Sequence, residues 1–142
     1  MSFPGATGKF PGEKHFVSWL GLCPNNRITG GQVKSTKTRK TVNRAANAFR
    51  MGAQSLANSN SGLGGFYRRI RARLGAPKAI TATAHKLARI FYRMWTTGLS
   101  YTDLGSDYYE NRYKERVLRN ITRRARELGY NAVLQPIEQR VA

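Results

Sequence analysis

The distribution of charge along the chain constrains its fold more than any other feature. From Lys14 to Thr102 there is no Asp or Glu, whereas the same 89 residues contain sixteen Lys and Arg residues. Six of the seven acidic residues lie at or after Asp103. A domain of this kind repels itself unless a polyanion lies against it, and a surface charged only for solubility mixes both signs. The charge therefore predicts contact with nucleic acid, the richest source of phosphate.

Length and composition indicate one domain in a reducing compartment. With 142 residues, 40% of them hydrophobic, the chain can bury one modest core. Its apolar stretches are much shorter than the ~20 residues of a membrane span, and we expect neither a membrane contact nor a signal peptide. Cys23 is the single cysteine, so it forms neither an internal disulfide nor a thiolate metal site. We expect a location in the cytoplasm, at the bacterial nucleoid.

The order of segments predicts a mainly α-helical chain. We expect an irregular lead-in over residues 1–12, a helical domain over residues 13–130 and a tail over residues 131–142. Residues 15–22 are predicted to form a short helix that ends at Gly21. Residues 23–40, CPNNRITGGQVKSTKTRK, are too long for a mere connection and predict a functional loop or weak hairpin.

Four further segments have apolar residues at helical spacing. They cover about residues 42–56, 63–74, 77–94 and 106–128. No series of strands is evident, so we predict a mainly α fold: a compact multi-helix domain with a long basic, Gly-containing loop near the N-terminus. The first apolar stripe begins at Val42. The core is expected to include seven of these apolar residues, namely Phe49, Ile70, Leu87, Phe91, Met94, Val117 and Ile121.

Carboxylate and histidine chemistry has little support in the sequence. Asp103, Asp107 and Glu110 lie near the start of the last predicted helix, where negative charge stabilises the positive end of the helix dipole. We interpret them as structural. His15 and His85 have no catalytic partner nearby in the sequence and are interpreted as surface or phosphate contacts.

The segment from Arg27 to Lys40 contains the parts of a phosphate-binding loop. Gly30 and Gly31 allow backbone amides to approach a phosphate closely, and the hydroxyl of Thr29 directly precedes them. Positive charge surrounds this pair. Three interpretations stay open on the residues alone: a phosphate-binding loop, a loop that carries a nucleophilic hydroxyl, and a flexible basic loop without a specific role. No base or metal ligand that would activate the hydroxyl is evident.

Four motifs resemble one protein family. Residues 15–31 are HFVSWLGLCPNNRITGG, residues 39–46 are RKTVNRAA, residues 74–89 are LGAPKAITATAHKLAR and residues 108–116 are YYENRYKER. Together, over about residues 10–130, they resemble the C-terminal domain of bacterial insertion-sequence transposases of the IS-one-ten and IS-one-sixteen type. Members of that family combine a RuvC-like DEDD domain with a serine domain, and a bridge RNA guides their recombination of DNA.

The resemblance implies DNA binding, DNA recombination and transposition of a transposable element. The family's nucleophilic Ser-Gly pair falls on Thr29-Gly30, so Thr29 is the candidate nucleophile position, although its extra methyl group crowds an attack on phosphorus. This chain has no counterpart of the acidic domain that holds Mg²⁺. We therefore expect a truncated or detached part that binds no cofactor itself, depends on Mg²⁺ only together with the missing RuvC-like domain, and transfers no strand alone.

The resemblance and the charge together select the candidate nucleic-acid contacts. These are Arg27, Gly30, Gly31, Lys34, Lys37, Arg39, Lys40, Asn43, Arg44, Lys78, His85, Lys86 and Arg89. The expected partners are DNA, a guide (bridge) RNA, an acidic RuvC-like domain or full-length transposase, and further copies of the chain. Two other functions stay open: a structural RNA-binding protein, for which such charge is ordinary, and a repressor that occupies the nucleic acid of its own element.

Overall fold

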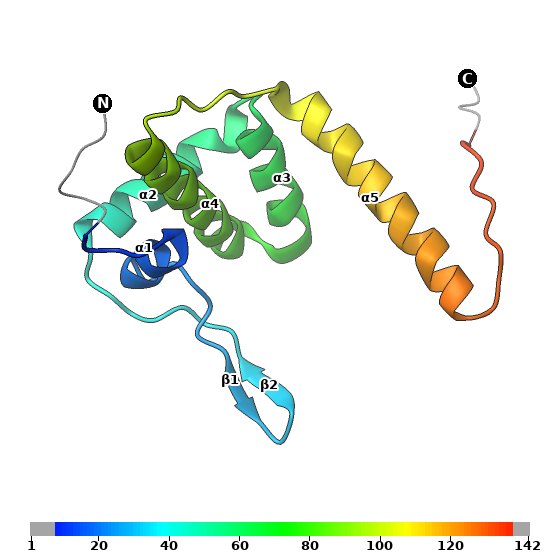
Figure 1. The fold of residues 1–142 in the computed structure, drawn as a ribbon, viewed down its shortest axis with the longest axis horizontal. Coiled ribbons are helices and arrows are strands. Elements are labelled where there is room, and N and C mark those ends of the chain that lie inside the picture. Colours follow the sequence, from blue (N-terminus) through cyan, green and yellow to red (C-terminus); the bar gives the residue numbers. More distant parts are fainter. Residues whose placement is uncertain (1–7, 138–142) are drawn as a thin grey trace.

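The structure, a computed structural model, describes residues 8–137 and is mainly α-helical, as the sequence predicts (Figure 1). Residues 1–7 of the predicted lead-in and residues 138–142 of the predicted tail lie outside the described residues. In chain order the elements are α1 (Glu13–Trp19), β1 (Arg27–Thr29), β2 (Gln32–Ser35), α2 (Arg44–Ser55), the 3-10 turn η1 (Leu56–Asn58), α3 (Gly62–Leu74), α4 (Ala76–Thr97) and α5 (Gly105–Glu127).

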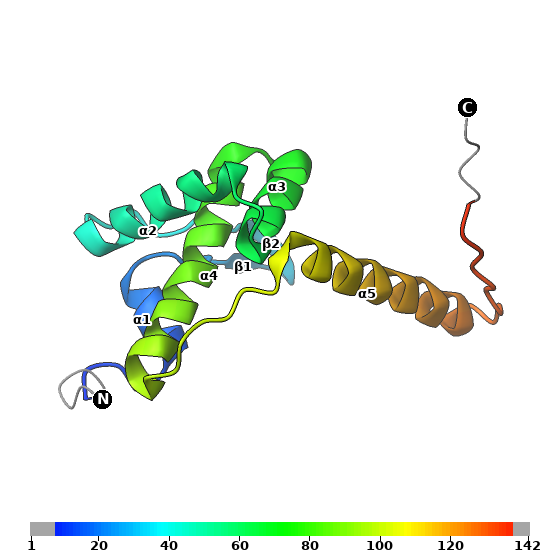
Figure 2. The ribbon, with the colours of Figure 1, turned by 90° about the horizontal axis from the view of Figure 1, so that it is seen from above.

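Helix α4 is the centre of the fold. It packs against α1, α2 and α3, which surround it on different sides. The β1–β2 hairpin projects from one end of this helical body, and α5 extends away from it, packing against α3 near its start (Figures 1 and 2). The two projecting elements carry no fully buried residue.

Local signals in the sequence account for the helix boundaries. Asn43 caps α2, because its side-chain oxygen accepts hydrogen bonds from the backbone N–H groups of Ala45 and Ala46 at 2.9 and 3.2 Å. Ser61 caps α3 in the same way, through the N–H group of Gly64 at 3.1 Å. Between α3 and α4 the chain turns at Gly75, whose φ of 87° is unfavourable for other residues. Pro77 lies in the first turn of α4, where the lack of an N–H group costs nothing.

The core lies where α1 and the segment after it meet α2 and α4. Leu20, Leu22 and Val17 are its largest fully buried side chains. Helices α2 and α4 contribute mostly small residues there: Ala46, Ala53, Ala84 and Ala88. Because these side chains are short, the helix backbones can approach one another closely around the larger residues of α1.

The predicted core is partly wrong. Phe91, Met94 and Ile121 are 47%, 41% and 44% exposed, and the four other residues of that set are half-buried. The predicted apolar stripe of α4 is Ile80, Ala84, Leu87, Phe91 and Met94. The buried positions of α4 are Ala79, Thr83, Ala84, Ala88 and Tyr92, so only Ala84 of the stripe is among them. The bulky residues of the stripe lie at the rim, where the ring of Phe91 still packs at 5.6 Å from that of Phe49.

Val42 and Ile121, which both belong to predicted apolar stripes, are exposed for simple reasons. Val42 is fully exposed because α2 begins after it, at Arg44. Ile121 is exposed because the second half of α5 lies beyond the reach of α3, so no other described element covers its apolar side (Figure 1). Helical periodicity identified both segments as apolar on one side, but it carries no information on whether a neighbouring element is present.

Candidate nucleic-acid interface

The long basic loop forms an exposed β-hairpin. Gly30 and Gly31, with φ values of 57° and 74°, make a two-residue turn, and the pair Thr29 and Gln32 closes it. A turn with two positive φ values matches the twist of the strands and favours glycine at both positions. A Cβ atom at either glycine would meet nothing within 4 Å. The glycines are therefore required for the backbone conformation, and they leave the tip of the hairpin free to approach a ligand.

The base of the hairpin contains a basic hollow of about 580 Å³. An isolated antiparallel β-bridge between Pro24 and Thr38 holds the two sides of the loop together. The Asn25 N–H group also donates a hydrogen bond of 3.1 Å to the Lys37 carbonyl oxygen. The lining residues are Asn25, Arg27, Ser35, Lys37, Thr38, Arg39 and Lys40. Four of them are cationic and none is acidic.

One of these cations is held in position by the helical body. The Arg39 guanidinium donates a hydrogen bond of 2.6 Å to the Ser18 carbonyl oxygen, near the C-terminal end of α1. The same Ser18 oxygen also accepts a hydrogen bond of 3.0 Å from the Gly21 N–H group, and a cation near the C-terminal end of a helix interacts favourably with the helix dipole. The interaction ties the base of the hairpin to α1, and it leaves the charge of Arg39 in the hollow.

The hollow has the chemistry of a phosphate site. Arg and Lys side chains supply positive charge and N–H donors, while Asn25, Ser35 and Thr38 add neutral polar groups. None of the salt bridges found between described residues involves one of its four cations. The hollow can therefore take up phosphate oxygens without first breaking an internal ion pair.

The structure brings only part of the predicted site together. Arg27, Lys37, Arg39 and Lys40 share the hollow, whereas Thr29, Gly30, Gly31 and Lys34 lie outside its lining, toward the tip of the hairpin. Thr29 and Lys34 are exposed, and the role of Thr29 as a nucleophile stays a prediction. Sequence reasoning missed Asn25, Ser35 and Thr38. Their only signal was their place among the basic residues of one loop.

The predicted contacts at the start of α2 have different environments. The side chain of Asn43 is engaged as the helix cap, so its oxygen already accepts two backbone hydrogen bonds. Arg44 is exposed at the first position of the helix, next in the chain to the polar segment that ends the hairpin. Of the two, Arg44 has the freer side chain for a phosphate.

The predicted contacts on α4 lie apart from the hairpin. Lys78 is exposed in the first turn, and Arg89 forms an ion pair with Glu13. Lys86 and Arg89 line a second groove, which shares no lining residue with the hollow. Partial burial, together with the positive charge of Arg89, lowers the pKa of His85. Lys86 and Arg89 therefore belong to a groove separate from the hollow of the hairpin, and Lys78 and His85 line neither of them.

The other reactive groups have structural surroundings. Partial burial raises the pKa of Cys23, despite the opposing charges of Arg39 and Arg89, and so favours the thiol form. The Asp103 carboxylate accepts hydrogen bonds from the N–H groups of Gly62 and Gly105 at 3.0 and 2.6 Å. Among residues 8–137, His, Cys, Asp and Glu side chains do not gather in any group of three or more suited to a metal ion.

The comparisons with known proteins gave one family match, which covers the N-terminal part of the chain. Residues 1–68 match a family described as "Transposase IS116/IS110/IS902 family". The matched range includes the hairpin and all of α2, while the motifs at residues 74–89 and 108–116 lie beyond it. Neither the curated proteins nor the solved structures gave a match. None of the helices in the described part of the chain combines the length and apolar composition needed to span a membrane.

Proposed function

We propose that this chain, whose residues 1–68 match the model of the IS116/IS110/IS902 transposase family, is a transposase-type protein that binds nucleic acid during the transposition of an insertion sequence. The observation that carries the proposal is the hollow at the base of the hairpin, where four cations converge without a carboxylate. It lies inside the part of the chain that matches the family. In this proposal the hollow receives backbone phosphates of the element's DNA.

The physical basis is electrostatic. Each cation that contacts a phosphate releases condensed counterions from the nucleic acid, so affinity falls as salt concentration rises. A fold whose first hundred residues contain a single carboxylate, Glu13, has few internal ion pairs to oppose this binding. Contacts of this kind position a protein on nucleic acid without reading its sequence. Recognition of a particular site would then belong to a guide RNA or to another domain.

The proposal assigns catalysis to a larger assembly. Thr29 would mark the position of the nucleophile, exposed beside the Gly30-Gly31 turn. Magnesium would be held by an acidic RuvC-like domain with which this chain acts. An activity of this kind belongs with the DNA in the cytoplasm of a bacterium.

A salt titration tests the role of the hollow. We would measure the affinity for a fluorescent duplex of about 20 base pairs by anisotropy, from about 50 to 200 mM salt. The test variant replaces Arg27, Lys37 and Lys40 with Ala and leaves Arg39, with its structural hydrogen bond, intact. The matched control removes the same charge from exposed positions of α5, as Arg119→Ala, Arg124→Ala and Arg126→Ala together.

The two variants should differ in slope. For the hollow variant, the slope of log affinity against log salt should become less steep by up to about 3, one for each lost phosphate contact. The control on α5 should retain most of the slope of the original protein. Equal slopes for the two variants would show that only net charge matters, and the hollow would lose its assigned role.

A further inference from the structure

A second basic groove lies between α3, α4 and α5. Its volume is about 620 Å³, and none of its lining residues belongs to the hollow of the hairpin. Seven lining residues are Lys or Arg, and Glu13 is the only acidic one. The positive residues come from three helices that are separated in the sequence. The groove is therefore a product of the tertiary fold and is not visible in any single motif.

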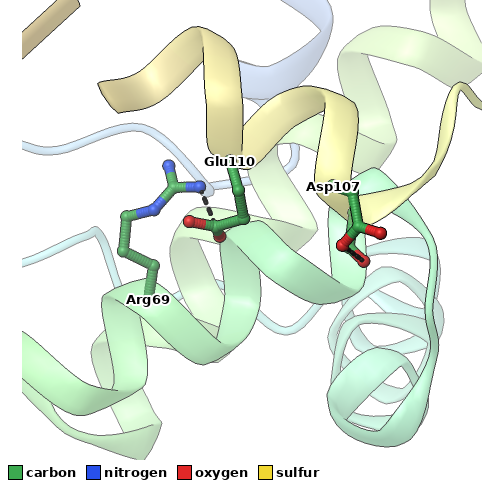
Figure 3. A network of polar contacts seen from close by, with 4 residues as sticks. Arg69, Asp107 and Glu110 are labelled. Carbon is green, nitrogen blue, oxygen red and sulfur yellow. Dashed lines mark hydrogen bonds and ion pairs between the residues drawn. The ribbon is translucent and has the colours of Figure 1, made fainter. Parts of the chain in front are cut away.

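Most of the positive charge in this groove has no internal partner. Glu13 pairs with Arg89, and Glu110 pairs with Arg69 at 2.8 Å across α3 and α5. Figure 3 shows the second pair, with Asp107 lying apart from it. Among the described residues, no carboxylate lies within 4.0 Å of the remaining five cations, which are Arg73, Lys86, Arg93, Arg112 and Arg116.

Aromatic rings contact two cations of the groove, the unpaired Lys86 and the ion-paired Arg69. The Lys86 ammonium lies 4.0 Å from the centre of the Phe66 ring, and the Arg69 guanidinium lies 4.0 Å from the centre of the Tyr113 ring. Tyr101 and Tyr109 also line the groove. Contact with an aromatic face stabilises a cation only modestly compared with an anion. The rings therefore hold the cations weakly, and phosphate oxygens would compete well for them.

The charges also crowd one another. Partial desolvation in the groove, followed by the nearby charges of Arg69, Arg116 and Arg89, lowers the pKa of Lys86. A bound anion would relieve this repulsion. A groove that contains both unpaired cations and aromatic rings matches the general design of surfaces for single-stranded nucleic acid, where the cations follow the backbone and the bases stack on the rings. A duplex offers no free base faces to such rings.

We propose that the groove between α3, α4 and α5 binds a single strand of nucleic acid. Arg73, Arg93 and Arg116 contact its phosphates. Lys86 moves from the ring of Phe66 to a further phosphate, and the ring then stacks with a base. The inference deepens the proposed function, because it adds a second surface for a different form of nucleic acid. A chain with both surfaces can hold a duplex at the hairpin and an unpaired strand beside α4.

The test uses a fluorescent oligo(dT) of about 20 nucleotides as the single-stranded probe, again with anisotropy at several salt concentrations. One variant combines Arg73→Ala, Arg93→Ala and Arg116→Ala, all exposed positions. Its slope of log affinity against log salt should become less steep by about 2, since each phosphate contact to a single strand contributes about 0.7. The α5 control variant with three arginines removed should keep most of the original slope.

A second variant separates stacking from charge. Phe66→Leu keeps an apolar side chain on α3 and removes the ring, so affinity for oligo(dT) should fall at least about fivefold with an unchanged salt slope. Circular dichroism would confirm that each variant is folded. If the groove variant binds oligo(dT) with the same salt slope as the α5 control, the groove has no specific ligand and the proposal is overturned. If polyglutamate of equal charge displaces oligo(dT) at the same concentration, the groove binds an acidic polypeptide equally well and the proposal is overturned.

The two proposals fail separately. If the groove variant leaves oligo(dT) binding unchanged while the hollow variant weakens duplex binding, only the single-strand groove is refuted. If the groove variant weakens oligo(dT) binding while the hollow variant leaves duplex binding unchanged, only the function assigned to the hairpin is refuted. The same labelled probes and control variant serve both measurements.

Discussion

Replacement of Gly64 by Ala is expected to destabilise the fold, although Ala is the better helix former. Gly64 is buried in the first turn of α3, where that turn packs against the end of η1. A Cβ atom there would overlap the Ser59 carbonyl oxygen and lie 2.9 Å from the Leu56 carbonyl oxygen. Both obstacles are backbone atoms, so no side-chain rotation relieves the overlap. Either η1 or the start of α3 has to move.

The expected loss is about 2 kcal/mol in the free energy of unfolding. Overpacking against a rigid neighbour costs about 3 kcal/mol at the upper end of its usual range, and the gain in helix propensity from Gly to Ala offsets at most about 1 kcal/mol. Gly52 in α2 is the matched control. A Cβ atom at Gly52 would lie 3.6 Å from Leu87 Cδ1, an ordinary contact. Gly52→Ala should therefore stabilise the protein by about 0.5–1 kcal/mol.

Urea unfolding followed by circular dichroism would measure both changes. The two substitutions are chemically identical and both lie in helices, so their difference of about 3 kcal/mol reports only the surroundings of the added methyl group. The denaturant dependence should be the same in both variants, because the surface exposed on unfolding hardly changes. If Gly64→Ala proves as stable as Gly52→Ala, the close packing of α3 against η1 is incorrect.

Three further predictions concern the Asp103 contacts, the core and the hairpin. Hydrogen bonds from Gly62, Gly105 and Tyr101 outweigh partial desolvation and hold the pKa of Asp103 below its ordinary value. The ionised carboxylate therefore stabilises the folded protein above the pKa that Asp103 has in the unfolded chain, and this stabilisation is lost as the pH falls through the pKa of the folded protein. The urea midpoint of Asp103→Asn should depend less on pH below about 4 than that of the original protein. Leu20 is fully buried, and Leu20→Ala should cost about 2–5 kcal/mol in urea unfolding. With an acidic RuvC-like domain supplied in trans, Thr29→Ala should abolish a covalent DNA adduct on denaturing gels without weakening duplex binding, whereas Thr29→Ser should increase the adduct. An adduct that survives Thr29→Ala would transfer the assignment to Ser35.

Local features of the sequence determined most of the secondary structure. The spacing of apolar residues indicated α2 to α5, and the short apolar segment before Gly21 indicated α1. Gly75 and Pro77 lie at the boundary between α3 and α4, and Gly129 follows the end of α5. A weak hairpin was one of the two structures expected for residues 23–40, and the Gly30-Gly31 turn forms its tip. These predictions succeed because helix caps, glycine turns and proline positions depend on interactions within a few residues. The absence of acidic residues from Lys14 to Thr102 also led to the expectation of a polyanionic partner without any knowledge of the fold.

The tertiary structure decided which apolar faces are buried and which charges share a surface. The helical pattern located an apolar side of α4. In the folded protein the small residues Ala84 and Ala88 of this helix are fully buried, whereas Phe91 lies at the rim. Arg73, Lys86 and Arg116 lie far apart in the sequence, and they meet in one groove only because α3 and α4 pack together and α5 crosses beside them. Burial and electrostatic interaction depend on distances between elements, and these distances arise only when the helices pack.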